Sequence, residues 1–125
     1  LFRSVVALPH LGASTPESED NCAKMAAEEL ITYLESGNIV NSVNYPNVSL
    51  LKSGEMRFCV LHKNVSGTLS KISTVFSDAG INIENMINGS KKDYAYTIVD
   101  LAQKVDAGFA EKLTADPDVI KVRII

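Results

Sequence analysis

The strongest constraint on the fold lies in residues 58–83, where the pattern of apolar residues changes twice. An apolar run at residues 58–61 is followed by a polar turn, by a stretch with helical spacing that ends at Gly80, and by a second apolar run. The helical stretch has one apolar stripe, formed by Leu69, Ile72, Val75, Phe76 and Ala79. Such a stripe is buried only against another element, so the segment predicts a strand, a helix and a second strand that pack together.

The residues that follow repeat this alternation. Strands are predicted at residues 56–63, 81–87, 93–101 and 119–125, and helices at residues 67–79 and 106–114. The order β-α-β-β-α-β with right-handed crossovers predicts an α+β, ferredoxin-like sandwich over residues 56–125. The helices can cover only one face of the sheet. Because the strands carry apolar residues on both faces, the second face is predicted to be a surface for self-association.

Three further segments precede the sandwich. Residues 4–8 predict a short strand and residues 9–13 a turn-rich loop. A long helix is predicted at residues 16–35, because hydroxyl residues and a proline mark its start and a glycine its end. Residues 38–55 are rich in asparagine and predict an extended linker. The chain thus divides into residues 1–37, 38–55 and 56–125, and we expect it to be the C-terminal piece of a longer protein.

Composition and charge exclude several classes of protein. Hydrophobic residues make up 46% of the chain, charged residues 22%, and the formal net charge is -3. These values are typical of a globular domain, and the lack of a basic stripe argues against nucleic acid as a partner. No apolar run approaches the roughly 20 residues of a membrane-spanning helix. Cys22 and Cys59 lack metal-ligand spacing, so we expect two buried, reduced thiols, no metal site and a cytoplasmic location.

Polar residues at three points of the predicted sandwich form the candidate binding site. His62 and Asn64 end the first strand, Gly67 begins the following helix, and Asn82 begins the second strand, so we expect these segments to converge. A helix start attracts a carboxylate, and an asparagine side chain offers both a donor and an acceptor. The set suits an amino acid as ligand. Alternatively, both asparagines satisfy only turn backbone, and the histidine is a half-exposed strand residue.

The motif His62-x-Asn64-x-x-Gly67, with Gly-Ile-Asn82-Ile further on, resembles the regulatory ACT domain of phosphoglycerate dehydrogenases. The resemblance implies that the domain binds L-serine, the end product of the pathway. It also implies a site between subunits, with His62 and Asn64 from one and Asn82 from its neighbour, across two sheets paired side by side. The chain departs from the family at residues 65–66, where it has Val-Ser and many relatives have Arg-Pro or Lys-Pro. We expect Ser66 to cap the helix there.

A second resemblance covers the first third of the chain. Residues 8–15 resemble the Pro-His-x-Gly-x-Ser-Thr stretch of NAD-dependent D-2-hydroxyacid dehydrogenases. This implies that His10 corresponds to the general acid/base that exchanges a proton with the substrate hydroxyl, and that Gly12 lies near the nicotinamide. The glycine-rich phosphate loop, the glutamate that orients the histidine and the substrate-binding arginine of that family are absent from the 125 residues. We therefore expect dehydrogenase activity from a full-length parent and none from this piece.

Together these features predict the regulatory part of an enzyme that oxidises 3-phosphoglycerate with NAD. The domain would form a homodimer, or a tetramer in the parent, and L-serine would favour one arrangement of the paired sheets and so inhibit the enzyme by feedback. Three alternatives remain at this stage: a module that dimerises without a ligand, a sensor of another amino acid, and an independent small enzyme that uses His10 or His62. No nucleophile–base pair or metal spacing supports the last.

Overall fold

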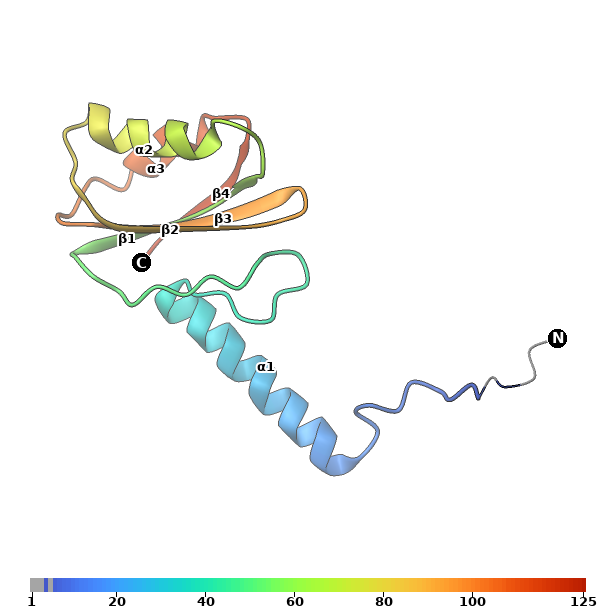
Figure 1. Ribbon diagram of the computed structural model, residues 1–125. Coiled ribbons are helices and arrows are strands. Elements are labelled where there is room, and N and C mark those ends of the chain that lie inside the picture. Colours follow the sequence, from blue (N-terminus) through green and yellow to red (C-terminus); the bar gives the residue numbers. More distant parts are fainter. Residues whose placement is uncertain (1–3, 5) are drawn as a thin grey trace.

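The computed structural model describes Ser4 and residues 6–125. Figure 1 shows a four-stranded sheet with two helices on one face, an irregular segment beneath the other face, and a long helix that projects away from the sheet. In chain order the elements are α1 (Pro16–Ser36), β1 (Met56–Lys63), α2 (Thr68–Asp78), β2 (Ile83–Lys91), β3 (Tyr94–Leu101), α3 (Phe109–Thr114) and β4 (Val119–Ile124).

The strands lie in the order β2-β3-β1-β4, and every neighbouring pair is antiparallel. This confirms the predicted ferredoxin-like sandwich, because the two strand–helix–strand units interleave their strands in one sheet. Strands β1 and β3 are central, and β2 and β4 form the edges. The β1–β3 pairing places Met56 opposite Leu101 and Lys63 opposite Tyr94, so the two central strands match along their whole length.

The main core lies between the sheet and helices α2 and α3. Three aromatic rings form its centre: the Phe76 and Phe109 rings are stacked at 5.3 Å, and Phe58 meets Phe76 edge-on at 5.4 Å. Burial of each such side chain stabilises the fold by roughly 1.5–3 kcal/mol. The other buried members of this core are Val60, Ile72, Ile81, Val99, Leu101 and Leu113. Of the apolar stripe predicted for the first helix of the sandwich, Ile72 and Phe76 are buried and Val75 packs against the core, whereas Leu69 and Ala79 are exposed.

Residues 38–55 do not form the extended linker that was predicted. Ile39 and Val48 exchange two backbone hydrogen bonds of 2.8 and 3.0 Å, and both side chains are buried against the outer face of the sheet. There they join Cys59, Tyr96 and Ile98 in a second core. The strands required a cover on both faces, and this segment supplies the second cover within the same chain. The apolar residues of this segment are too scattered in sequence to predict that it packs on the sheet. Because it does so, most of the outer face is not available for self-association.

Several element boundaries also differ from the predictions. Strand β2 runs through Lys91, so the hairpin turn consists only of Lys92 and Asp93 rather than residues 88–92. Helix α2 begins after Gly67, which adopts a left-handed φ of 85° and makes no side-chain capping bond, so Ser66 is not the cap. Helix α3 begins only at Phe109, because the Asp106 carboxylate accepts the Gly108 N–H (2.8 Å) in a preceding turn.

The region before the sandwich contains one regular element. Ser4 and residues 6–8 form no strand, since no described strand lies beside them to pair with, and residue 5 lies outside the described part. Helix α1 starts as predicted, although Thr15 rather than Ser14 caps it by accepting the Ser18 N–H (3.2 Å). None of the residues of α1 is buried, and Cys22 is exposed, which contradicts its predicted burial. In the described residues, no helix has the length and apolarity to cross a bilayer.

Candidate functional site

His62 lies near the end of β1, on the face of the sheet that the helices cover. Its side chain is 3% exposed, so it is buried rather than half-exposed. Both ring nitrogens have partners: Nδ1 lies 2.8 Å from the carbonyl oxygen of Lys63, and Nε2 lies 2.9 Å from the Thr97 hydroxyl on β3. The ring is therefore held in one orientation at the point where the chain leaves the sheet.

Asn64 follows the end of β1 and ties it to the β2–β3 hairpin. Its side-chain amide donates to the Lys92 carbonyl (2.9 Å), and its backbone N–H donates to the Asp93 carbonyl (2.8 Å). The side chain is exposed. Asn64 therefore has the role of satisfying turn backbone, and it still presents an amide to solvent close to His62.

Asn82 is exposed in the loop before β2, and the structure does not bring it near His62 within one chain. The register places Ile83 beside Leu101 and Met56, whereas Lys91 lies beside Tyr94 and Lys63. Asn82 and His62 thus lie at opposite ends of the sheet, about seven residues or roughly 23 Å apart along a strand. Convergence within one chain is wrong. A site shared between two chains stays a prediction.

His10 and Gly12 lie on the exposed segment before α1. A Cβ atom added at Gly12 would meet nothing within 4 Å, so Ser4 and residues 6–125 form no wall of a cofactor site there. Figure 1 shows this segment leading away from the sheet. The described residues also contain no group of three or more His, Cys, Asp or Glu side chains that could hold a metal ion.

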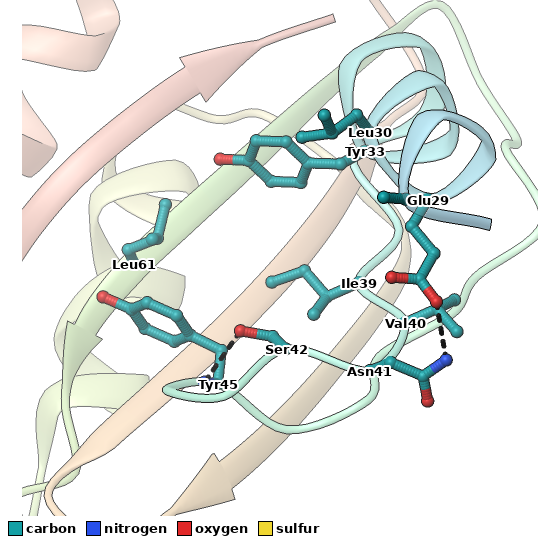
Figure 2. Close-up of a pocket in the computed structure, with 10 residues that line it drawn as sticks. Glu29, Leu30, Tyr33, Ile39, Val40, Asn41, Ser42, Tyr45 and Leu61 are labelled. Atoms are coloured by element: carbon teal, nitrogen blue, oxygen red, sulfur yellow. Dashed lines mark hydrogen bonds between the residues drawn. The ribbon is translucent and has the colours of Figure 1, made fainter. Parts of the chain in front are cut away.

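A cavity of about 490 Å³ lies on the outer face of the sheet, between α1 and the segment that follows it. Figure 2 shows Leu30 and Tyr33 of α1, Ile39 and Tyr45 of the segment, and Leu61 of β1 around it. Its polar end is closed by a hydrogen bond of 2.7 Å from the Asn41 amide to the Glu29 carboxylate. The lining is mainly apolar and includes none of the predicted binding residues, so a small polar amino acid would find few partners in it.

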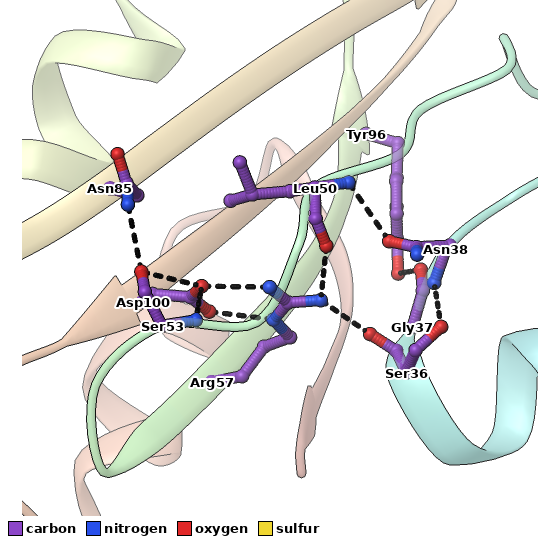
Figure 3. A network of polar contacts seen from close by, with 9 residues as sticks. All are labelled: Ser36, Gly37, Asn38, Leu50, Ser53, Arg57, Asn85, Tyr96 and Asp100. Atoms are coloured by element: carbon purple, nitrogen blue, oxygen red, sulfur yellow. Dashed lines mark hydrogen bonds and ion pairs between the residues drawn. The ribbon is translucent and has the colours of Figure 1, made fainter.

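A buried ion pair on the outer face, near the start of β1 and the end of β3, was not predicted from the sequence. Arg57 on β1 and Asp100 on β3 are both fully buried, and two bonds of 2.6 and 2.7 Å join the guanidinium to the carboxylate. Figure 3 shows the third guanidinium nitrogen donating to two carbonyls, of Ser36 (2.7 Å) and Leu50 (3.0 Å). Asp100 also accepts the backbone N–H of Ser53 at 2.9 Å. Both charges are therefore fully hydrogen-bonded, which is what makes their burial tolerable.

The ion pair shifts the pKa values of both Asp100 and Arg57. Burial alone would raise the pKa of Asp100, but the hydrogen bonds from Arg57 and Ser53 outweigh it and hold that pKa below its ordinary value of 3.8. The hydrogen bond to Asp100 raises the pKa of Arg57 in turn. Asp100 is consequently ionised across the neutral range, and its stabilising contribution is lost only in acid.

Arg57 belongs to a set of three donors that hold the C-terminal end of α1, which we call the helix clamp: Arg57, Tyr96 and Arg123. The Tyr96 hydroxyl donates to the carbonyl of Gly37 (2.6 Å). Arg123 on β4 donates to the carbonyls of Tyr33 and Leu34, both at 3.1 Å. The last carbonyls of a helix lack partners within the helix and carry a partial negative charge. The clamp satisfies these carbonyls from β1, β3 and β4. The signal in the sequence was Arg57 and Asp100 inside otherwise apolar strands.

We expect Asp100→Asn to lower the free energy of unfolding by roughly 3–5 kcal/mol, because it leaves the Arg57 charge buried without its counterion. In the unmodified chain the contribution of Asp100 is complete above pH 3.8 and falls as the pH drops below it, and the variant loses this dependence. Urea unfolding between pH 3 and pH 7 measures both effects.

Asp118→Asn is the control for this experiment. Asp118 also pairs with a cation, Lys71, at 3.3 Å, but the Lys71 side chain is 52% exposed. Its loss should cost about 1 kcal/mol or less. Equal destabilisation by the two variants would contradict a central role of the buried pair.

Comparison with known proteins gives three findings. Residues 58–118 match the family model "ACT domain". The chain is 31% identical over 99% of its length to D-3-phosphoglycerate dehydrogenase of Escherichia coli (strain K12), and 30% identical over 98% of its length to D-3-phosphoglycerate dehydrogenase 2 of Saccharomyces cerevisiae. It spans 31% and 27% of these relatives. Among solved structures, the ACT domain from GTP pyrophosphokinase of Chlorobium tepidum has a TM-score of 0.48 at 14% identity, over 56% of this chain and 83% of that one. The family model and the two relatives confirm the resemblance seen in the sequence.

Proposed function

Because residues 58–118 form an ACT domain, we propose that this chain is the C-terminal regulatory part of an NAD-dependent phosphoglycerate dehydrogenase. In this proposal the domain binds L-serine between two subunits and inhibits the cytoplasmic parent enzyme by feedback. Similarity to D-3-phosphoglycerate dehydrogenases over nearly the whole chain supports the identity of the parent. The positions of Asn82 and His62 at opposite ends of one sheet are the observation on which the two-subunit site rests.

Strand β2 provides the seam for such a dimer. It is an edge strand, and none of the described strands pairs with its outer side. An unpaired edge is a template for another strand, and closed dimers usually have two-fold symmetry. Antiparallel pairing of β2 with its copy places the start of one β2 beside the end of the other. Because Lys91 is level with Lys63, the partner subunit's Asn82 would then lie at the end of the sheet where His62 and Asn64 lie.

The chemistry of the three side chains suits L-serine. The ligand has a carboxylate that needs donors, an ammonium group that needs acceptors, and a hydroxyl that can do both. Each asparagine amide offers a donor and an acceptor, and a histidine N–H is a donor. Hydrogen bonds to charged groups contribute about 1.5–3 kcal/mol each. Two or three such bonds give a measurable affinity, so the site does not require an apolar pocket.

The helix clamp offers a path from this seam to the rest of the parent. Arg57, Tyr96 and Arg123 hold the end of α1 from three strands of the sheet that would pair at the seam. A change in how two sheets pair would therefore change the direction in which α1 leaves the domain. A coupling free energy of about 1–3 kcal/mol is sufficient for feedback inhibition.

NAD belongs to the parent and not to this chain. The chain lacks a glycine-rich phosphate loop, and His10 and Gly12 stand on an exposed segment without surrounding walls. The residues present do not fit the cofactor, so His10 is assigned a role as general acid/base only in the full-length enzyme.

We expect calorimetric titration of the chain with L-serine to show binding, and Asn64→Ala and Asn82→Ala each to weaken it by roughly ten- to a hundredfold. A mixture of the two variants tests the shared site. Each mixed dimer combines an intact Asn64 with the partner subunit's intact Asn82 at one of its two sites, so equal mixing should restore tight binding at about a quarter of all sites.

No recovery in the mixture would contradict the two-subunit site. Lack of heat at millimolar L-serine in the unmodified chain would contradict the proposal as a whole and indicate a module that only dimerises. A thermal-shift panel of the other amino acids then separates that outcome from a sensor with a different ligand.

Cys22 on α1 is a selective labelling site for a test of the coupling between the seam and α1, because Cys22 is exposed and Cys59 is buried. A spin label on Cys22 should report a change in the distance between the two α1 helices of the dimer when L-serine is added. Arg123→Gln removes two bonds to the helix end and should reduce this change. Lys121→Gln, on the same strand and outside the clamp, should leave it intact. An unaltered response in Arg123→Gln would contradict the proposed path.

The chain alone should produce no NADH from 3-phosphoglycerate and NAD, since the phosphate-binding loop is missing. Absorbance at the NADH band, with a full-length phosphoglycerate dehydrogenase as positive control, checks this. Turnover by the chain would refute the assignment of a regulatory part.

A further inference from the structure

We propose that Thr97 and Asn88 are positioning residues that hold His62 ready to receive the carboxylate of the ligand. The observation is a line of hydrogen bonds across three strands. From His62 on β1, Nε2 lies 2.9 Å from the Thr97 hydroxyl on β3, and this hydroxyl donates to the Asn88 side-chain oxygen on β2 at 2.9 Å. Thr97 is fully buried, whereas Asn88 is exposed on the edge strand. We call His62, Thr97 and Asn88 the polar relay.

Alternation along the strands puts the polar relay on one face. Val60 lies opposite Thr97, and Thr97 lies opposite Asn88, so all three side chains face the helix layer together with His62, two residues beyond Val60. The neighbouring positions on this face, such as Val60 and Val99, are apolar core. A histidine and a threonine so deeply buried need partners, and the relay supplies them.

The bonds define which ring nitrogen is available to a ligand. A carbonyl can only accept, so Nδ1 must donate to the Lys63 carbonyl. The Thr97 hydroxyl, which donates to Asn88, lies beside Nε2 and occupies that nitrogen. Nε2 points into the domain. Nδ1 lies at the chain exit beside Asn64. Its N–H can exchange the Lys63 carbonyl for an incoming carboxylate as its hydrogen-bond acceptor.

The charged side chains near this end of the sheet do not take the place of the polar relay as hydrogen-bond partners of His62. The acidic side chains before β4 are engaged elsewhere: Asp116 pairs with Lys71 at 3.1 Å, and Asp118 pairs with Lys63 and Lys71. None of the ion pairs among the described residues includes His62. The other charged residues here are Lys92 and Asp93 in the hairpin turn, whose carbonyls bind Asn64. Within the described part of the chain His62 thus has no carboxylate partner, and its Nδ1 can donate to an incoming carboxylate.

The inference therefore concerns the L-serine site of the proposed function and rests on it. The relay holds the His62 ring in one orientation, with Nδ1 at the chain exit. A donor that is already oriented binds a carboxylate more strongly than one that must be ordered on binding. The relay also connects the His62 ring to β2, the strand proposed to pair between subunits, through two hydrogen bonds.

Thr97→Val tests this, because valine keeps the shape of threonine and removes the hydroxyl. We expect L-serine affinity to fall about tenfold, the loss of one good hydrogen bond. Thr97→Ser restores the hydroxyl and should recover the affinity. Calorimetric titrations with L-serine measure these affinities, and denaturant unfolding confirms that each variant is folded.

A purely structural role of Thr97 would give a different result. If Thr97→Val bound L-serine with unchanged affinity, or if Thr97→Ser were impaired to the same degree, the proposal would be overturned.

Nitrogen NMR of the His62 ring separates failure of the relay from failure of the proposed function. The ¹⁵N shifts report the protonation of each ring nitrogen without any ligand. If the unmodified chain binds no L-serine, the serine site is wrong, and the relay is then judged by these shifts alone. A change in Thr97→Val that is absent from Thr97→Ser supports the relay, and identical spectra in all three proteins reject it.

Discussion

The buried pair of Arg57 and Asp100 is the interaction on which the arrangement of this chain depends. Moving two charges out of water costs several kcal/mol for each ion, and only good geometry and complete hydrogen bonding compensate. Here the compensation comes from two further segments, because the pair also binds the backbone at Ser36 of α1 and at Leu50 and Ser53 of residues 38–55. The position of α1, the path of residues 38–55 and the central strands are therefore fixed by one polar cluster, and none of them can move without leaving a charge unsatisfied.

The two faces of the sheet hold different groups of residues. The helix-facing side holds the main core and, at one end, the polar relay of His62, Thr97 and Asn88. The outer side holds the second core and the helix clamp. The central strands β1 and β3 contribute alternate residues to both, so that His62 and Arg57 lie on the same strand but on opposite faces. A displacement of these strands reaches His62 and the end of α1 together, which is what the proposed regulatory role requires.

Much of the sandwich could be predicted because its signals are local. The apolar stripe of α2 and the alternation in β4 each lie within a dozen residues, and the order of elements then leaves few possible topologies. The errors arose where local preference competes with tertiary contacts. Ser66 was a plausible cap, but the turn that orients the chain requires the left-handed φ of Gly67. Cys22 was expected to be buried, yet it is exposed, as none of the residues of α1 is buried.

The sequence by itself determined the fold class, the family resemblance and the identities of His62, Asn64 and Asn82, because periodicity and motif spacing are properties of short segments. Only the tertiary structure decided where these residues stand relative to one another. It placed Asn82 at the far end of the sheet from His62, gave both nitrogens of His62 partners, and joined Arg57 to Asp100 across 43 residues of chain. The physical reason is that register and strand order are set by the packing of both faces at once, which no single segment encodes.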